Sequence, residues 1–123
     1  MDLVFRLELL KKGNQIDQEV FIAMNNVIEL FKNNWDIELS EENGQMMITH
    51  LSMALMRVKN KLPVNQIDEE VYQEVTESKF FKKAEKILED MKSILPIELP
   101  ESEIKYMLVN NTLILENLNE GGN

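Results

Sequence analysis

Residues 40–58 read SEENGQMMITHLSMALMRV and carry the clearest helical pattern in the chain. Ser40 supplies a side-chain oxygen that can cap a first turn, and Glu41 and Glu42 suit the positive end of a helix dipole. Apolar residues then recur at helical spacing, which predicts a helix with one face in the core that ends before Pro63. The predicted stripe contains Met46, Met47, His50, Leu51, Met53, Ala54 and Val58.

Similar patterns on both sides of this stretch predict five more helices. They cover residues 3–12, a segment from Asp17 to near Trp35, a short segment from Asp68, residues 80–95 and a segment that Pro100 opens. Gly13 is typical of a position just past a helix end, and the residue before Pro96 is pushed out of the helical region. The core candidates of the last helix are Ile104, Met107, Leu108, Leu113 and Leu115.

The composition agrees with these helical patterns. The 123 residues include only 4 Gly and 3 Pro, whereas the good helix former Met occurs 8 times. We therefore predict an all-α fold, and the length favours a single domain.

The charge and the residue counts argue against several classes of protein. A net charge of −9 disfavours direct binding to nucleic acid, because that binding depends largely on Lys and Arg. With no Cys and one His, a zinc site is not expected, and we predict neither a metal nor a cofactor. The acidic groups Glu41–Glu42 and 68–70 are interpreted as first-turn charges of helices rather than as a cation site.

The sequence also gives no sign of a membrane segment. Charged residues interrupt the apolar N-terminal stretch, and no window approaches 18 consecutive apolar residues. We expect a cytoplasmic protein without a membrane span.

A constant offset of 60 residues aligns two halves of the chain. Residues 37–41 (IELSE) match residues 97–101 (IELPE), and Met47 matches Met107. Two copies are too few for a solenoid, so the repeat predicts a pseudo-symmetric bundle in which each half is a helix, a turn and a second helix. At this offset His50 corresponds to Asn110, and we expect these two side chains to be hydrogen-bonding partners between the packed helices.

His50 is the one residue with two competing interpretations. It is either a half-buried structural hydrogen-bonding group or a reactive imidazole, for which Arg57, two turns later, is a counter-charge to a bound anion. A catalytic triad is disfavoured because Ser52 points to another helix face. The methionines Met46, Met47, Met53, Met56 and Met107 either fill the core or form an adaptable binding surface.

These residues resemble the PTS regulation domain (PRD), a helical module of the bacterial phosphoenolpyruvate-dependent sugar phosphotransferase system. The similarity rests on His50, Leu51, Ala54, Leu55 and Arg57, on residues 37–40 before them and on residues 95–104 before the last helix. It covers residues 15 to 117, nearly the whole chain.

The resemblance implies a compact bundle of five main helices in two antiparallel pairs, here preceded by a short N-terminal helix. It also implies a regulatory protein rather than an enzyme, in which His50 accepts phosphate from HPr or an enzyme IIB. Two positions depart from the family pattern: Thr49 replaces an Asp, and Asn110 replaces a second His. The expected site is therefore His50 as the only phosphoacceptor, supported by Arg57, Thr49 and Asn110.

The same resemblance gives the expected domain organisation and assembly. We expect an N-terminal extension over residues 1–14, the PRD-like bundle over 15–118 and a disordered tail over 119–123. Since the chain shows no nucleic-acid-binding module, its output would pass through a partner protein, and the family resemblance and the Met-rich helix surface favour a homodimer. The alternative is a PRD-derived dimerisation or scaffold protein in which His50 is not phosphorylated.

Overall fold

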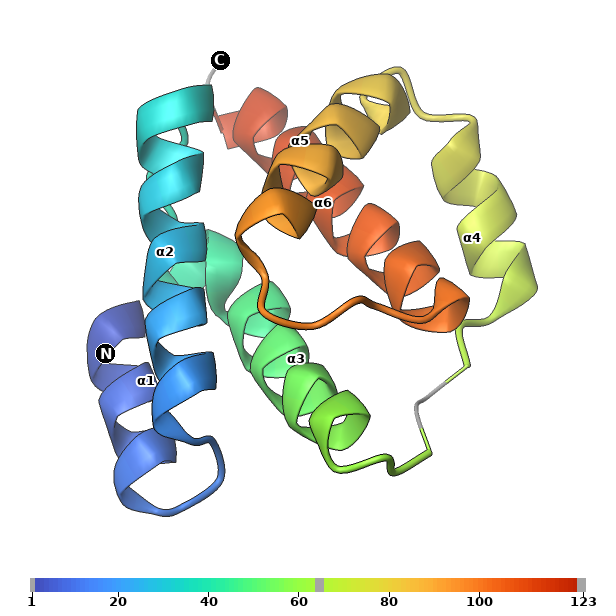
Figure 1. Cartoon of the computed structure of the whole chain (residues 1–123). Coiled ribbons are helices and arrows are strands. Elements are labelled where there is room, and N and C mark those ends of the chain that lie inside the picture. The colour runs from blue at the N-terminus through green and yellow to red at the C-terminus, as the bar shows by residue number, and fades with distance from the viewer. Residues whose placement is uncertain (1, 64–65, 122–123) are drawn as a thin grey trace.

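The structure is a computed structural model that describes residues 2–63 and 66–121 (Figure 1). The described residues contain six helices and no strand, which confirms the all-α prediction. The helices are α1 (Leu3–Lys12), α2 (Gln18–Trp35), α3 (Glu41–Lys59), α4 (Glu69–Thr76), α5 (Phe81–Ile94) and α6 (Glu101–Gly121).

The helices begin and end where the local sequence predicts. The Asp17 side chain accepts a hydrogen bond from the backbone N–H of Val20, and Asp68 caps α4 in the same way. Ser40 and Asn43 form a reciprocal capping box at the start of α3. Helix α5 ends at Ile94, just before the Leu95–Pro96 step.

Packing brings the two sequence halves together. Helix α5 packs against α6 and α2, and α3 packs against α6 and α2. Helix α1 covers α2 and α3 at one end of the bundle, while α4 lies on the opposite side against α6 (Figure 1). The predicted contact between the helix of His50 and the helix of Asn110 is confirmed as the α3–α6 interface.

The core follows the 60-residue repeat. Positions equivalent under this offset are buried in both halves, and these pairs include Met24/Ala84, Val27/Ile87, Phe31/Met91, Met47/Met107, Ile48/Leu108 and Leu55/Leu115. Because equivalent residues occupy equivalent places, the repeat is a property of the packed molecule and not only of the sequence.

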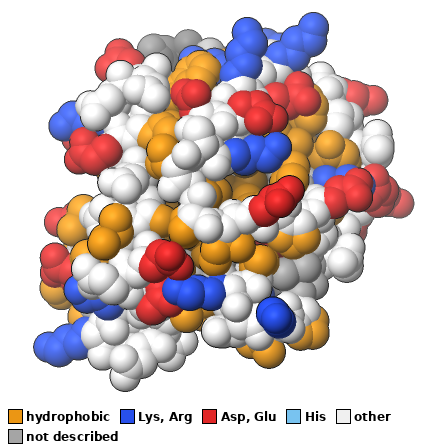
Figure 2. Space-filling model, viewed as in Figure 1, with side chains coloured by type: hydrophobic (Ala, Val, Ile, Leu, Met, Phe, Trp, Pro, Cys, Tyr) orange, Lys and Arg blue, Asp and Glu red, His pale blue; other side chains and the backbone are white. Residues whose placement is uncertain are grey.

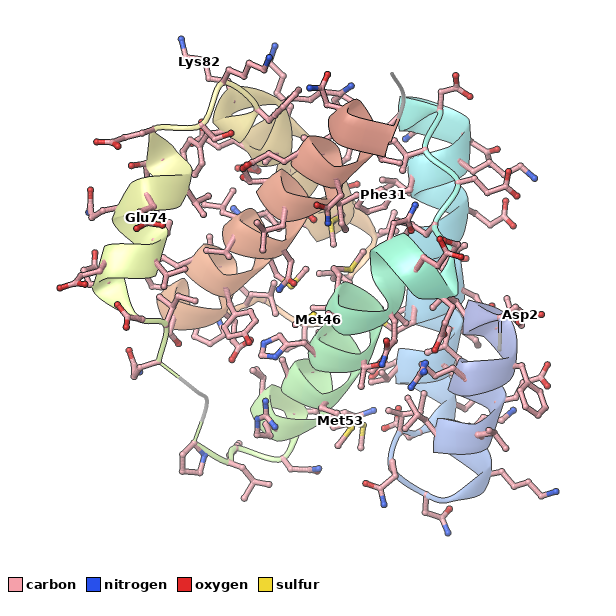
Figure 3. All side chains as sticks on the ribbon, turned by 180° about the vertical axis from the view of Figure 1, so that it is seen from behind. Asp2, Phe31, Met46, Met53, Glu74 and Lys82 are labelled. Atoms are coloured by element: carbon pink, nitrogen blue, oxygen red, sulfur yellow. The ribbon has the colours of Figure 1, made fainter. Side chains whose placement is uncertain are left out.

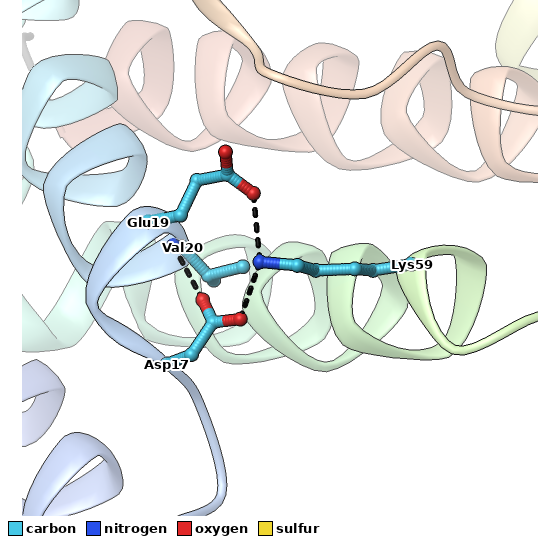
Figure 4. A network of polar contacts seen from close by, with 4 residues as sticks. All are labelled: Asp17, Glu19, Val20 and Lys59. Carbon is cyan, nitrogen blue, oxygen red and sulfur yellow. Dashed lines mark hydrogen bonds and ion pairs between the residues drawn. The ribbon is translucent and has the colours of Figure 1, made fainter.

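Polar contacts between helices lie around this core. The Trp35 indole N–H donates to Asp90 Oδ2 at 2.9 Å and joins α2 to α5, and Arg6 pairs with Glu41 to join α1 to α3. The ammonium of Lys59, at the end of α3, bridges Asp17 and Glu19 at the start of α2 (Figure 4). The hydrogen bond from Lys59 lowers the pKa of Asp17, and the two carboxylates raise the pKa of Lys59.

Two predicted core residues are exposed. Met46 is 72% exposed, because it lies about 100° around α3 from Met47, away from the centre of the buried face. Leu113 is 46% exposed, because it lies two residues, or about 200°, from both Asn111 and Leu115. The stripes predicted from the sequence were wider than the faces that pack.

Two further observations concern the chain end and the surface. Helix α6 continues to Gly121 and so includes residues 119–121, while residues 122–123 of the expected tail lie outside the described residues. On the face shown in Figure 2, acidic and basic side chains alternate over short distances, with apolar side chains between them. None of the helices described is long and apolar enough to cross a membrane.

Candidate functional site

His50 lies at the α3–α6 interface and contacts a buried carboxylate. Its Nε2 lies 2.8 Å from Glu103 Oε2. The Glu103 side chain is fully buried, whereas 13% of the His50 side chain is exposed. Glu103 occupies the first turn of α6, where the helix dipole favours a negative charge. The pair therefore joins the middle of α3 to the N-terminal end of α6.

Tyr106 fixes the plane of the imidazole. It follows Glu103 by three residues on α6, and its ring stacks on His50 with centroids 3.7 Å apart and planes 4° apart. Since residues three apart lie on the same helix face, Glu103 and Tyr106 hold the His50 ring from the same direction. One contact fixes an edge of the ring and the other fixes a face.

The prediction that Asn110 is the hydrogen-bonding partner of His50 was wrong. Asn110 Nδ2 donates to the backbone carbonyl of Tyr106, within its own helix, at 3.1 Å. His50 instead meets α6 one to two turns before Asn110, because the two helices cross. Sequence reasoning missed Glu103, although a signal was present: it lies four residues before Met107, on the buried stripe of α6.

The two other predicted supporting residues lie on α3 but do not bond to His50. Arg57 is partly buried, its Nε has no hydrogen-bond partner, and no ion pair joins it to a described residue. The buried hydroxyl of Thr49 also has no partner. By contrast, the Ser52 hydroxyl donates to the carbonyl of Ile48, as helical hydroxyls commonly do.

Three polar atoms in this region are thus buried without a protein partner: Thr49 Oγ1, Arg57 Nε and Glu103 Oε1. Buried polar atoms are usually hydrogen-bonded, and exceptions need an explanation. Two of these atoms are donors and one is an acceptor. Thr49 is next to His50 in the chain, Arg57 lies two turns later on the same helix, and Glu103 contacts His50 directly.

The repeat places a different set of residues at the equivalent site. Under the 60-residue offset, His50, Glu103 and Tyr106 correspond to Asn110, Asn43 and Met46. The last three line one pocket of about 190 Å³ between α3 and α6, together with Leu113 and other residues. Met46 is labelled in Figure 3, which views this side of the molecule. The equivalent site therefore lies between the same two helices but has no imidazole, and its two amides bond elsewhere: Asn43 to the backbone of Ser40 and Glu38, and Asn110 to the carbonyl of Tyr106.

The other pockets and acidic groups among the described residues do not involve His50. They contain no group of three or more His, Asp or Glu side chains arranged to hold a metal ion. A pocket of about 400 Å³ lies between residues 66–69 and the start of α6, and it is lined by residues other than His50. The acidic residues at the starts of α3 and α4 lie in first turns, as the capping interpretation predicts.

Comparison with known proteins gives a family for this arrangement. The PRD domain family matches residues 25–110, more than two-thirds of the chain, and the matched segment contains His50, Arg57, Glu103 and Tyr106. The chain is similar to an uncharacterized protein of Haemophilus influenzae, with 25% identity over 117 residues that cover 94% of each chain.

It is also similar to the uncharacterized protein YhfY of Escherichia coli, with 25% identity over 105 residues that cover 85% of this chain and 88% of YhfY. No solved structure matches the chain. Because the family match extends over most of the helical bundle, the chain belongs to the PRD domain family.

Proposed function

We propose that this PRD protein is a regulatory module whose state is set by phosphorylation of His50. Its phosphodonor would be HPr or an enzyme IIB of the sugar phosphotransferase system, and its output would pass through a partner protein. The observation that carries the proposal is the held imidazole: the only His in the chain lies between two helices, is fixed by Glu103 and Tyr106 and keeps 13% of its side chain exposed.

The electrostatics of the region explain why such a modification would act as a switch. A phosphoryl group adds nearly two negative charges and three strong acceptor oxygens. It would enter a protein of net charge −9, close to the buried carboxylate of Glu103, so α3 and α6 would have to shift unless a cation balances it. Arg57 Nε and the hydroxyl of Thr49 are buried donors on α3 without a partner among the described residues.

The test is incubation of the chain with phosphoenolpyruvate, enzyme I and HPr, followed by detection of acid-labile phosphate; purified enzyme IIB proteins replace HPr in parallel samples. We expect labelling of wild type and none of His50→Gln. Gln keeps an N–H that can donate to Glu103 but has no nucleophilic nitrogen, so the control protects the fold. Labelling of His50→Gln equal to wild type, or no labelling of wild type by any donor, contradicts the proposal.

We propose in addition that the chain acts as a homodimer, in which phosphorylation changes the packing of helix pairs or subunits. The exposed Met46 and Leu113 on the α3–α6 side provide a pliable apolar surface for such packing. Light scattering at high micromolar concentration is expected to give the mass of a dimer, and a monomer mass contradicts this part of the proposal.

One observation favours a second function, that of a dimerisation or scaffold protein. The contacts of His50 with Glu103 and Tyr106 are also those of a structural residue that links two helices. In that case His50→Gln changes stability but no interaction with a partner, and wild type takes up no phosphate. The labelling experiment therefore separates the two functions.

A further inference from the structure

We propose that Nδ1 of His50 is the atom that accepts the phosphoryl group, and that Glu103 is the positioning residue that directs transfer to it. This inference rests on the proposed function, because it names the reacting atom of the same site. It follows from which ring nitrogen is already engaged and from how the ring is held.

The contact with an ionised Glu103 favours one tautomer of the neutral ring. The helix dipole at the first turn of α6 favours an ionised Glu103, and an ionised carboxylate can only accept a hydrogen bond, so at the 2.8 Å contact we assign the proton to Nε2, which donates to Glu103 Oε2. In a neutral imidazole the other nitrogen then holds the free lone pair. That nitrogen is Nδ1, and no hydrogen bond joins it to any of the described residues.

Transfer to Nε2 would meet two obstacles. The fully buried carboxylate of Glu103 occupies the position in front of Nε2, so an incoming phosphoryl group would first have to displace it. Once displaced, the negative charge of Glu103 would lie beside a phosphoryl group that is also negative. At Nδ1 no hydrogen-bonded carboxylate occupies the position of attack, and the Glu103 carboxylate lies across the ring, next to Nε2.

The stack on Tyr106 is compatible with attack from Nδ1. A nitrogen lone pair of imidazole lies in the plane of the ring, so the phosphorus must approach along that plane. Tyr106 covers one face of the ring, with only 4° between the two planes, and does not occupy the ring edge. It therefore restricts rotation of the ring while it leaves the line of attack along the plane unblocked.

The transfer balances without another acid or base. In the donor, a protein phosphohistidine with its ring protonated, the P–N bond breaks and the donor imidazole leaves as a neutral ring. A new P–N bond forms at Nδ1 of His50, and the proton on Nε2 stays in place. The product ring is positively charged, and that charge lies 2.8 Å from Glu103 Oε2, which stabilises it as in other carboxylate–imidazole pairs.

The first test uses the unphosphorylated protein. His50 is the only His, so nitrogen NMR of the uniformly labelled chain gives a single imidazole to assign. We expect a protonated Nε2 and an unprotonated Nδ1 in the neutral ring. A neutral ring protonated on Nδ1 would overturn the inference whether or not the protein can be phosphorylated.

The second test identifies the phosphorylated atom after labelling through enzyme I and HPr. Phosphorus–nitrogen couplings are expected to place the phosphoryl group on Nδ1. Phosphate found on Nε2 would overturn this inference and leave the proposed function intact. Absence of any labelling would overturn the proposed function together with this inference, even if the tautomer is as expected.

Variants of Glu103 separate positioning from a merely structural role. Glu103→Gln keeps an oxygen that accepts from Nε2–H but removes the charge, so phosphorylation should become about tenfold slower with the phosphate still on Nδ1. Glu103→Leu removes the acceptor, and a mixture of the two phosphorylated forms is expected. Glu101→Gln, which removes an exposed carboxylate from the same first turn of α6, is the matched control and should change neither rate nor position. A single phosphorylated form on Nδ1 in Glu103→Leu would overturn the role given to Glu103.

Discussion

Ser52 of α3 and Thr112 of α6 make the same hydrogen bond at positions 60 residues apart. Each hydroxyl donates to the backbone carbonyl four residues earlier, at 2.7 Å to Ile48 and 2.8 Å to Leu108, and both side chains are fully buried. The two hydroxyls have equivalent positions in the repeat, the same burial and the same kind of partner. The two halves of the chain therefore pack in the same way at these positions.

The two halves differ at the candidate site, where equivalent positions carry different polar side chains. This difference is the reason to connect the site with function. Where one half places His50, the other places Asn110, and the carboxylate of Glu103 is matched by the amide of Asn43. Equivalent core positions are apolar and buried in both halves, whereas these polar positions carry different residues in the two halves. The equivalent position therefore lacks the imidazole and the buried carboxylate, although the same two helices pack there.

The first prediction is that two substitutions create a second phosphoacceptor. In a His50→Gln background, Asn110→His combined with Asn43→Glu should restore phosphorylation, because both residues line the same pocket between α3 and α6. Glu at position 43 also suits the Ser40 capping box, in which Glu is a preferred third residue. Acid-labile phosphate and peptide mass spectrometry measure the result.

Two controls define this experiment. Asn110→His alone lacks the carboxylate and should be labelled more slowly than the combined variant. Asn43→Glu alone has no imidazole in the His50→Gln background and should remain unlabelled. Equal labelling with and without the new carboxylate would show that the pseudo-symmetry does not extend to the chemistry.

The second prediction concerns the stability contributed by His50 and Glu103. His50→Ala should lower the free energy of unfolding by about 3–5 kcal/mol, because it leaves the fully buried Glu103 carboxylate without its partner. His50→Gln, which keeps a donor, should cost clearly less. Urea unfolding followed by the fluorescence of Trp35, the single Trp, measures both values.

A double-mutant cycle checks that this cost comes from the contact. His50→Ala and Glu103→Leu should not be additive, since the combined variant removes the carboxylate that the first substitution left unpaired. We expect a coupling energy of about 1–3 kcal/mol. Additive effects would mean that the two residues stabilise the fold independently.

The sequence predicted the helices well and the site only in part, for one physical reason. Helix ends depend on nearby residues such as Asp17, Ser40 and Pro96, which act within a few positions of themselves. The partner of His50 depends on the angle and the position at which α3 crosses α6. The spacing of residues along the sequence gives no information about that crossing. The 60-residue offset correctly paired the helices, but the contact lies between non-equivalent positions, His50 and Glu103.

Exposure of the predicted core residues has a related cause. Helical spacing marks every apolar residue within a broad stripe, whereas the packed face of α3 is narrower and centred near Met47 and Leu51. Met46 and Leu113 fall outside the packed faces and meet at the pocket of the equivalent site. The sequence identified the helices that pack but not the width of their contact.

The third prediction is a pH-dependent contribution from the ion pairs of Lys59. The Nζ of Lys59 lowers the pKa of Asp17, so this part of the stability is present above the unfolded value of about 3.8 and is lost as the pH falls through the folded value. The pKa of Lys59 is raised, so its part is present below about 10.5 and is lost as the pH rises through its folded value.

Lys59→Met should therefore destabilise the protein most between these limits. The decrease in thermal midpoint is expected to be small, because the three side chains are about one-third or more exposed, and smaller still in high salt. Lys82→Met is the matched control, since Lys82 is exposed and makes no ion pair with a described residue. An equal decrease at pH 7 and near pH 2 would contradict the assignment to ion pairs.

The last prediction concerns Arg57 as the cation that balances the phosphoryl group. Seven residues separate it from His50, or about 10 Å along the helix axis, and helical side chains lean toward the N-terminus, here toward His50. Arg57→Ala should lower the steady-state phosphorylated fraction several-fold, and Arg57→Lys should give an intermediate value, since Lys keeps the charge but loses the planar fork that binds phosphate oxygens.

The matched controls are variants that remove a comparable group elsewhere. Arg6→Ala removes the other Arg of the chain, which pairs with Glu41 to join α1 to α3, so it should lower stability without changing the phosphorylated fraction. Asn110→Ala should also leave that fraction unchanged, because Asn110 bonds to its own helix. If Arg57→Ala is phosphorylated to the wild-type extent, the counter-charge must come from another residue. The unpartnered Nε of Arg57 would then have no part in holding the phosphate.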